Sequence, residues 1–280
     1  MKSTTSFSLP VLYCIIKTAS SIYKGGKYYY PKGLSLDFLI FLDFDGVICD
    51  SINECLVSSW YGYYHLYKQQ QPLVVSPILK KRFLRLRPFI RTGEDYMVIQ
   101  ELLAADIRIS NQLDFDRQLE ISGKQKLELF KTLFYKARTY YLKEHTDYWF
   151  SLNPIYAHLK SELSALSASP LFYILSTKKA DFILEILMNN GITMNRERII
   201  YSAPQQKLSI IGAILDKKNA ASRALLLDDQ IEHLSGNHDP RIQTFLCLWG
   251  YIKEEWSIGS KDIKSLTTEG FARLINDLTW

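Results

Sequence analysis

The hydrophobic and polar positions divide the chain into three parts. A continuous apolar run over residues 36–42, with one acidic residue near its start, is typical of a strand buried on both faces of a parallel sheet. From about residue 52 to residue 150 the apolar positions repeat at helical spacing. From Leu171 onward, short apolar runs alternate with helical segments. This order predicts an α/β protein, a doubly wound parallel sheet with an inserted helical region.

The elements expected within these parts follow from the same pattern. In the insert we predict helices at 53–68, 94–105 and 113–145, the last with an apolar face formed by Leu127, Phe130, Phe134 and Ala137. After it we predict strands at 171–175, 199–201, 224–227 and 245–248, and helices at 180–189, 208–215 and 271–278. The pair Asn190-Gly191 is a usual signal for the end of a helix. We expect a core domain of residues 35–51 and 151–280, and a helical cap domain of residues 52–150.

The first 34 residues form a separate N-terminal extension in this interpretation. Their apolar run from Leu9 to Ile16 is interrupted by Pro10, and it is short for a signal peptide. No stretch reaches the roughly 20 apolar residues that a membrane span needs. We expect a helix here that packs on the body of the protein, connected to it through Gly25-Gly26 and residues 28–31.

Composition narrows the class of protein. Hydrophobic residues make up 47% of the 280 residues and charged residues 22%, which excludes a disordered chain. Lys plus Arg exceeds Asp plus Glu by 34 to 29, but the basic residues are spread along the chain, with one cluster at 80–91. We therefore predict no nucleic-acid partner. The four cysteines show no zinc or redox spacing, as expected for reduced thiols in a cytoplasmic protein.

Polar clusters follow four of the predicted elements of the core. Ligands of parallel α/β sheets bind beyond the carboxyl ends of the strands, so these clusters are expected to meet. The clusters are Asp43 with Asp45 after the first strand, Ser176-Thr177-Lys178 after the second, Lys207 after the third, and Asp228-Asp229 after the fourth.

The residue types themselves indicate phosphoryl transfer. A carboxylate can attack phosphorus and form an acyl-phosphate, and Asp43 is the better candidate nucleophile because the strand end holds it. Asp45 can protonate the leaving group and then activate water. Gly46 lets the backbone approach the phosphoryl group closely. Lys207 can neutralise charge at Asp43, and Ser176 can donate to a phosphoryl oxygen. Thr177 is the alternative to Ser176, and Lys178 is a weaker alternative to Lys207.

A divalent cation would reconcile these carboxylates with a phosphate. Mg²⁺ prefers hard oxygen ligands, which fits Asp43, the backbone carbonyl of Asp45 and one acid of the Asp228-Asp229 pair. The five histidines are scattered without the spacing of metal ligands, so we predict no role for them.

The chain resembles the haloacid dehalogenase (HAD) superfamily over residues 36 to 250. The resemblance is carried, in this order, by Asp43-Phe44-Asp45-Gly46-Val47-Ile48, Ile174-Leu175-Ser176-Thr177-Lys178, Lys207 and Leu226-Leu227-Asp228-Asp229. It implies a Rossmann-like core with a helical (C1-type) cap, Asp43 as nucleophile and Asp45 as acid and base. It further implies Asp229 as a direct magnesium ligand and Asp228 as a ligand through water.

The reaction and substrate are narrowed but not fixed. The dehalogenases of this superfamily lack an acid at the position of Asp45, so its presence favours phosphoryl transfer. The most polar part of the insert, residues 85–95, places Arg87 or Arg91 where either side chain could contact an anionic part of the substrate. A capped site predicts a small phosphorylated metabolite as substrate. A phosphomutase and a non-catalytic phospho-ligand binding protein remain alternatives, and the oligomeric state is open.

Overall fold

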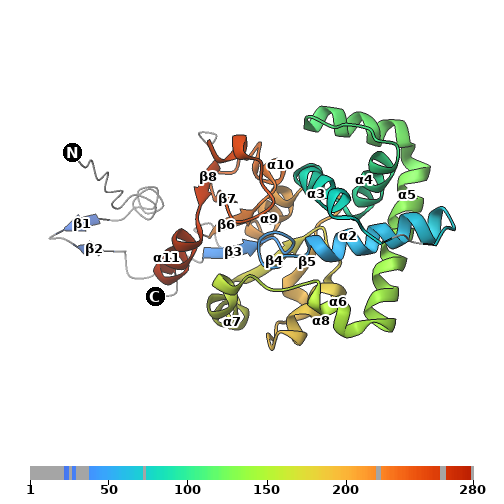
Figure 1. Cartoon of the computed structure of the whole chain (residues 1–280). Coiled ribbons are helices and arrows are strands. Elements are labelled where there is room, and N and C mark those ends of the chain that lie inside the picture. Colours follow the sequence, from blue (N-terminus) through green and yellow to red (C-terminus); the bar gives the residue numbers. More distant parts are fainter. Residues whose placement is uncertain are drawn as a thin grey trace, which may run out of the picture.

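The centre of the molecule is a six-stranded, all-parallel sheet (Figure 1). The structure, a computed structural model, describes residues 22–24, 27–29, 38–71, 74–218, 222–258 and 263–278. The strand order is β5-β4-β3-β6-β7-β8. The strands are β3 (Phe38–Leu42), β4 (Phe172–Ser176), β5 (Ile199–Tyr201), β6 (Arg223–Asp228), β7 (Ile242–Cys247) and β8 (Ile263–Leu266). The order turns outward in both directions from β3, as in a doubly wound sheet.

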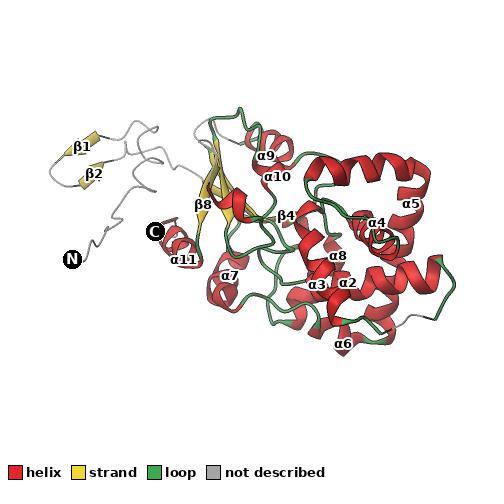
Figure 2. Ribbon diagram, turned by 45° about the horizontal axis from the view of Figure 1, so that its top comes forward, coloured by secondary structure: helices red, strands yellow, loops and turns green. Residues whose placement is uncertain are grey.

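Helices cover both faces of this sheet, as Figure 2 shows. Along β3 the side chains alternate: Ile40 and Leu42 belong to one apolar core, and Leu39 and Phe41 to another. The first core includes residues of α7 (Lys160–Ala168), α8 (Ala180–Asn189) and α11 (Thr268–Leu278). The second includes residues of α9 (Lys207–Leu215) and α10 (Ile231–Leu234). Burial on both faces explains the continuous apolar runs of the strands, and the predicted fold class is confirmed.

The helical insert lies between β3 and β4 and has an apolar core of its own (Figure 1). Its helices are α2 (Ile52–Trp60), which continues as a π-helix (Tyr61–Tyr67), α3 (Pro77–Leu86), a 3₁₀ turn (Arg87–Phe89), α4 (Gly93–Ala104) and α5 (Gln112–Glu144). The chain returns to the sheet through α6 (Thr146–Ser151) and a second 3₁₀ turn (Ala157–Leu159). Phe130, Phe134 and Ala137 are buried, as the predicted apolar face of α5 requires.

Three features differ from the sequence-based expectation. The helix α5 is broken at Gly123, whose backbone has φ 73° and ψ 157°. The elements α3, α6, α7 and β8 were not predicted. The strands β1 (Ile22–Lys24) and β2 (Lys27–Tyr29) pair antiparallel in a segment where no strand was expected. The helix expected in the N-terminal extension lies outside the described residues. Among the described helices, none has the length and apolar character of a membrane span.

Candidate active site

The predicted polar clusters converge at the carboxyl edge of the sheet. Asp43 directly follows β3, Ser176 ends β4, Lys207 begins α9, and Asp228 ends β6. A small cavity of about 30 Å³ lies here between the core and the helical insert. Its lining includes Asp43, Asp45, Thr177, Lys178, Asp229 and His233 from the core, and Arg87, Tyr96, Tyr135 and Arg138 from the insert. The parallel topology brings these side chains together because all the strand ends share one edge.

Lys207 bridges two buried carboxylates in the centre of the site. Its Nζ lies 2.9 Å from Oδ1 of Asp43 and 2.7 Å from Oδ2 of Asp228. Burial would lower the pKa of Lys207, but Asp228 and Asp43 together raise it, so the ammonium stays charged. Burial raises the pKa of Asp43 against the opposing effect of Lys207. Burial opposes ionisation of Asp228 too, yet Lys207 and His233 hold its pKa below the usual range.

Asp229 is a buried carboxylate that lacks sufficient positive charge. Its Oδ2 accepts a hydrogen bond from the backbone N–H of Tyr251 at 2.7 Å. Burial, with Asp228 and Asp43 nearby, raises the pKa of Asp229 to about 7, although Arg87 acts in the opposite direction. A carboxylate in this setting is stabilised by an added cation.

Two glycines allow Asp229 to take this position. Gly46 has φ +91°, and a Cβ built on it would lie 2.1 Å from Oδ2 of Asp229. A Cβ on Gly250 would lie 2.3 Å from Cβ of Asp229. The close approach that Gly46 permits in this structure is therefore that of Asp229. The predicted approach of Gly46 to a phosphoryl group stays a prediction.

The residues present fit a metal ion. One ligand atom each from Asp43, Asp228 and His233 lies within 4.8 Å of the others, so this group could bind a metal. His233 comes from the short helix α10, and its Nδ1 lies 3.0 Å from Oδ2 of Asp228. We assigned the histidines no role from sequence. The signal was local: His233 follows Asp228 by five residues, within the first turn after the strand end.

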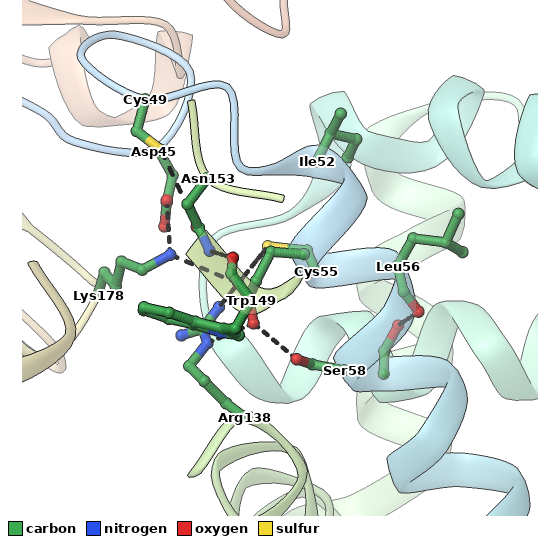
Figure 3. A network of polar contacts seen from close by, with 12 residues as sticks. Asp45, Cys49, Ile52, Cys55, Leu56, Ser58, Arg138, Trp149, Asn153 and Lys178 are labelled. Atoms are coloured by element: carbon green, nitrogen blue, oxygen red, sulfur yellow. Dashed lines mark hydrogen bonds and ion pairs between the residues drawn. The ribbon is translucent and has the colours of Figure 1, made fainter. Parts of the chain in front are cut away.

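Asp45 is held by the second lysine of the site, Lys178. The Nζ of Lys178 lies 2.9 Å from Oδ1 of Asp45 and 3.5 Å from Oε2 of Glu54 (Figure 3). Burial would raise the pKa of Asp45, but Lys178 and Arg138 lower it. Lys178 and Lys207 thus serve different acids, so Lys178 is not a substitute for Lys207 in this arrangement.

Ser176 and Thr177 occupy different positions relative to the cavity. Ser176 is buried, and its Oγ accepts a hydrogen bond from the backbone N–H of Lys178 at 3.3 Å. Thr177 is half-buried and lines the cavity, whereas Ser176 is not among its described lining residues. Of the two predicted donors, Thr177 is therefore the one that borders the cavity.

Arg87 and Arg91 have distinct surroundings. Arg87 is buried, with its guanidinium carbon 4.3 Å from the ring centre of Tyr251, and its Nε has no hydrogen-bond partner among the described residues. Arg91 forms a two-point contact with Asp116 of α5, at 2.7 and 3.0 Å, and also pairs with Glu232 of α10. Both arginines line the cavity. Arg91 also joins the insert to the core, while the Nε of Arg87 has hydrogen-bonding capacity left.

Sequence reasoning missed two further residues of the site. Tyr251 follows β7, and besides its contact to Asp229 its hydroxyl donates to Asp50 at 2.6 Å and accepts from the backbone of Ile52 at 3.0 Å. Gln230 lines the cavity and is 3% exposed, and its side-chain amide has no partner among the described residues. No sequence signal marks Tyr251. Gln230 could have been predicted as a site residue, because it directly follows the acid pair Asp228-Asp229.

Comparison with known proteins identifies the fold and not the reaction. No protein-family profile matches the chain, and no curated protein matches its sequence. Among solved structures, a protein described as a predicted phosphoglycolate phosphatase from Haemophilus somnus is similar, with TM-score 0.55 and 14% identity. That match covers 85% of this chain and 97% of that one. A haloacid dehalogenase-like hydrolase family protein from Streptococcus pneumoniae matches with TM-score 0.51 and 17% identity, over 85% and 98% of the two chains.

A third similar structure limits what the fold implies. Protein tyrosine kinase A of Mycobacterium tuberculosis matches with TM-score 0.51 and 12% identity, over 87% of this chain and 99% of that one. One fold therefore carries different names and activities, and function must be argued from the site. The sheet order, the position of the acids at its carboxyl edge and these similarities agree: the chain has the fold of the haloacid dehalogenase superfamily.

Proposed function

We propose that the protein is a Mg²⁺-dependent phosphatase of small phosphate monoesters that acts through an aspartyl-phosphate on Asp43. One observation carries the proposal: Asp43, from the end of β3, shares the buried ammonium of Lys207 with Asp228, from the end of β6. The adjacent Asp229 is compensated only in part, by Arg87, and its pKa is raised to about 7. This arrangement supports a carboxylate nucleophile beside a cation site, which is what transfer of a dianionic phosphoryl group requires.

Asp43, the backbone carbonyl of Asp45 and Asp229 would hold Mg²⁺, and Asp228 would act through water. The bound ion would neutralise negative charge on the carboxylates and on the phosphoryl oxygens. His233 lies beside this set through its contact with Asp228.

In the first step a carboxylate oxygen of Asp43 forms a bond to phosphorus. The bond from phosphorus to the ester oxygen breaks, and its electron pair stays on that oxygen, which takes a proton from Asp45. Lys178 favours the carboxylate form of Asp45 in the free protein. Asp45 becomes an acid once the negative charge of the substrate lies beside it.

In the second step a water oxygen attacks phosphorus, and its proton passes to Asp45. The bond from phosphorus to Asp43 breaks, which restores the carboxylate and releases inorganic phosphate. Lys207 neutralises charge on Asp43 and the transferring group, and Thr177 donates a hydrogen bond to a phosphoryl oxygen. After the second step Asp43 is again a free carboxylate and Asp45 again carries its proton, so a new catalytic cycle can begin.

The insert side of the cavity favours an anionic leaving group. Arg87 and Gln230 are buried and line the cavity, and each has unused hydrogen-bonding capacity. Arg91 and Arg138 add two further guanidinium groups to the lining. A carboxylate on a small alcohol would satisfy Arg87, so the proposed substrates are small phosphate esters that carry an acid group.

The test is release of phosphate from p-nitrophenyl phosphate and from a panel of phosphorylated metabolites with Mg²⁺ present. We expect turnover by the wild-type protein and loss of turnover in Asp43→Asn. The matched control is Asp181→Asn, which alters an exposed aspartate of α8. Isomerised product without free phosphate would indicate the phosphomutase instead, and binding without turnover would indicate the binding protein.

The metal site has a test that does not depend on activity. We expect Mg²⁺ to raise the Tm of the wild-type protein and not that of Asp229→Asn. In the absence of metal the variant should be at least as stable as the wild type, because it removes an undercompensated buried charge and keeps an oxygen for the N–H of Tyr251. Equal stabilisation of both proteins by Mg²⁺ would contradict the assignment of Asp229.

A further inference from the structure

Four charged side chains of alternating sign run from the cavity into the helical insert. Figure 3 labels three of them: Asp45, Lys178 and Arg138. Asp45 pairs with Lys178 at 2.9 Å, and Lys178 lies 3.5 Å from Glu54. Arg138 donates to both carboxylate oxygens of Glu54, at 2.9 and 2.7 Å. Asp45 and Lys178 belong to the core, whereas Glu54 lies on α2 and Arg138 on α5 of the insert. The series therefore crosses from one part of the molecule to the other.

Burial and further contacts fix the positions of Lys178, Glu54 and Arg138 in this series. The side chains of Lys178 and Glu54 are fully buried, and that of Arg138 is 3% exposed. Ser58 donates to Glu54 at 2.6 Å, and the guanidinium carbon of Arg138 lies 4.5 Å from the ring centre of Phe134. A buried ion held on several sides has one orientation, because any other would leave a charge without a partner.

Asp45 is the most exposed of the three members of the series that line the cavity, the others being Lys178 and Arg138. Its side chain is 15% exposed, whereas the other three are almost completely enclosed. The position of its carboxylate thus depends on Lys178, and the position of Lys178 depends on a carboxylate supplied by the insert. The series therefore connects the most exposed of its carboxylates, Asp45, to two charged side chains of the insert.

We propose that Glu54 and Arg138 are positioning residues for Asp45: they hold Lys178 where it orients the Asp45 carboxylate toward the leaving-group oxygen. This inference rests on the proposed phosphatase function. The insert thus helps to orient Asp45, the acid–base residue of the core, through the contact between Lys178 of the core and Glu54 of the insert.

The test compares two substrates in Glu54→Gln. Release of p-nitrophenolate needs little protonation, whereas release of an alkoxide depends on a well-placed acid. We expect kcat for the best alkyl phosphate of the panel to fall at least about tenfold more than kcat for p-nitrophenyl phosphate, with KM little changed, because a general acid is worth about 10²–10⁴-fold. The matched control is Glu101→Gln, which removes the carboxylate of the Glu101–Lys126 ion pair within the insert and should leave the ratio unchanged.

A second variant separates positioning from folding. Glu54→Gln with Arg138→Met removes one charge of each sign, so it leaves no new unpaired ion, and it should show the same selective loss. Its crystal structure should show Lys178 displaced from Asp45. Equal loss on both substrates, or an unmoved Lys178, would overturn the inference while the wild-type activity stands. Absence of turnover in the wild type would overturn the proposed function itself.

Discussion

Lys207 and Asp43 form a buried ion pair, with Nζ 2.9 Å from Oδ1, although they come from separate crossovers of the sheet. The same ammonium lies 2.7 Å from Asp228, so one positive charge serves two carboxylates. Both acids are almost completely buried, so solvent compensates little of their charge. The site is therefore sensitive to the loss of this single cation.

Replacement of this lysine in Lys207→Met should impair both stability and activity. It leaves two buried carboxylates without their common partner, so we expect the free energy of unfolding to fall by about 3–5 kcal/mol. We expect kcat to fall on the order of 10²-fold because a group that neutralises developing charge is lost. Urea unfolding and steady-state kinetics measure the two effects. Lys217→Met, at an exposed position, is the control, and similar behaviour of the two variants would refute the role of Lys207.

Arg87→Met should change substrate preference. A hydrogen bond to a charged group is worth about 1.5–3 kcal/mol, so kcat/KM for phosphate esters with a carboxylate should fall roughly 10- to 150-fold. Esters without an acid group should change little. Arg85→Met, which removes an exposed arginine of α3, is the control. A uniform fall across all substrates would show that Arg87 supports the fold of the insert and does not select the leaving group.

Gly250→Ala should disturb Asp229 specifically. Its Cβ would lie 2.3 Å from Cβ of Asp229 and 2.8 Å from the backbone oxygen of Gly46, and neither atom can move freely. We expect the free energy of unfolding to fall by about 1–3 kcal/mol. We also expect that Mg²⁺ no longer raises the Tm of the variant. Gly212→Ala on α9 meets no atom closer than 3.8 Å and should stabilise the protein by up to about 1 kcal/mol. Retained stabilisation of Gly250→Ala by Mg²⁺ would contradict the prediction.

Asp95 should make stability depend on pH. Burial raises its pKa to about 6, against the hydrogen bonds that it accepts from the backbone of Arg91 and Thr92. Between the ordinary value, 3.8, and about 6 the folded protein holds a proton that the unfolded chain has lost. Stability at this site therefore decreases as pH rises through that interval and is constant above it.

Asp95→Asn removes this titration and retains an oxygen that can accept both backbone hydrogen bonds. The free energy of unfolding of the variant, relative to that of the wild type, should be higher at pH 7 than at pH 4 by on the order of 1–3 kcal/mol. Urea unfolding of both proteins at the two pH values measures this difference. Other groups titrate equally in the two proteins and cancel in the difference. A difference that does not change with pH would show that Asp95 is ionised throughout.

The elements that the sequence predicted best are those with clear local signals. β5 (Ile199–Tyr201) and α8 (Ala180–Asn189) have the expected bounds, because β5 is a short apolar run that follows charged residues and Asn190-Gly191 marks the end of α8. The missed helix α3 has only two buried side chains, Phe83 and Leu86, so its apolar pattern is weak. β8 is a four-residue edge strand with two buried residues, which is too short to show a period.

For the site, the sequence determined which acids, lysines and hydroxyls lie at one edge of the sheet, because parallel strands place their carboxyl ends together. Only the tertiary structure decided the pairing: Lys207 with Asp43, Lys178 with Asp45, and Arg91 with Asp116 and Glu232. Both Arg87 and Arg91 line the cavity, but the Nε of Arg87 has no hydrogen-bond partner among the described residues. The tertiary structure alone brought Glu54 to Arg138 across 84 residues. The physical reason is that strand order follows from local hydrophobic patterns, whereas the partner of a buried charge depends on how distant segments pack around it.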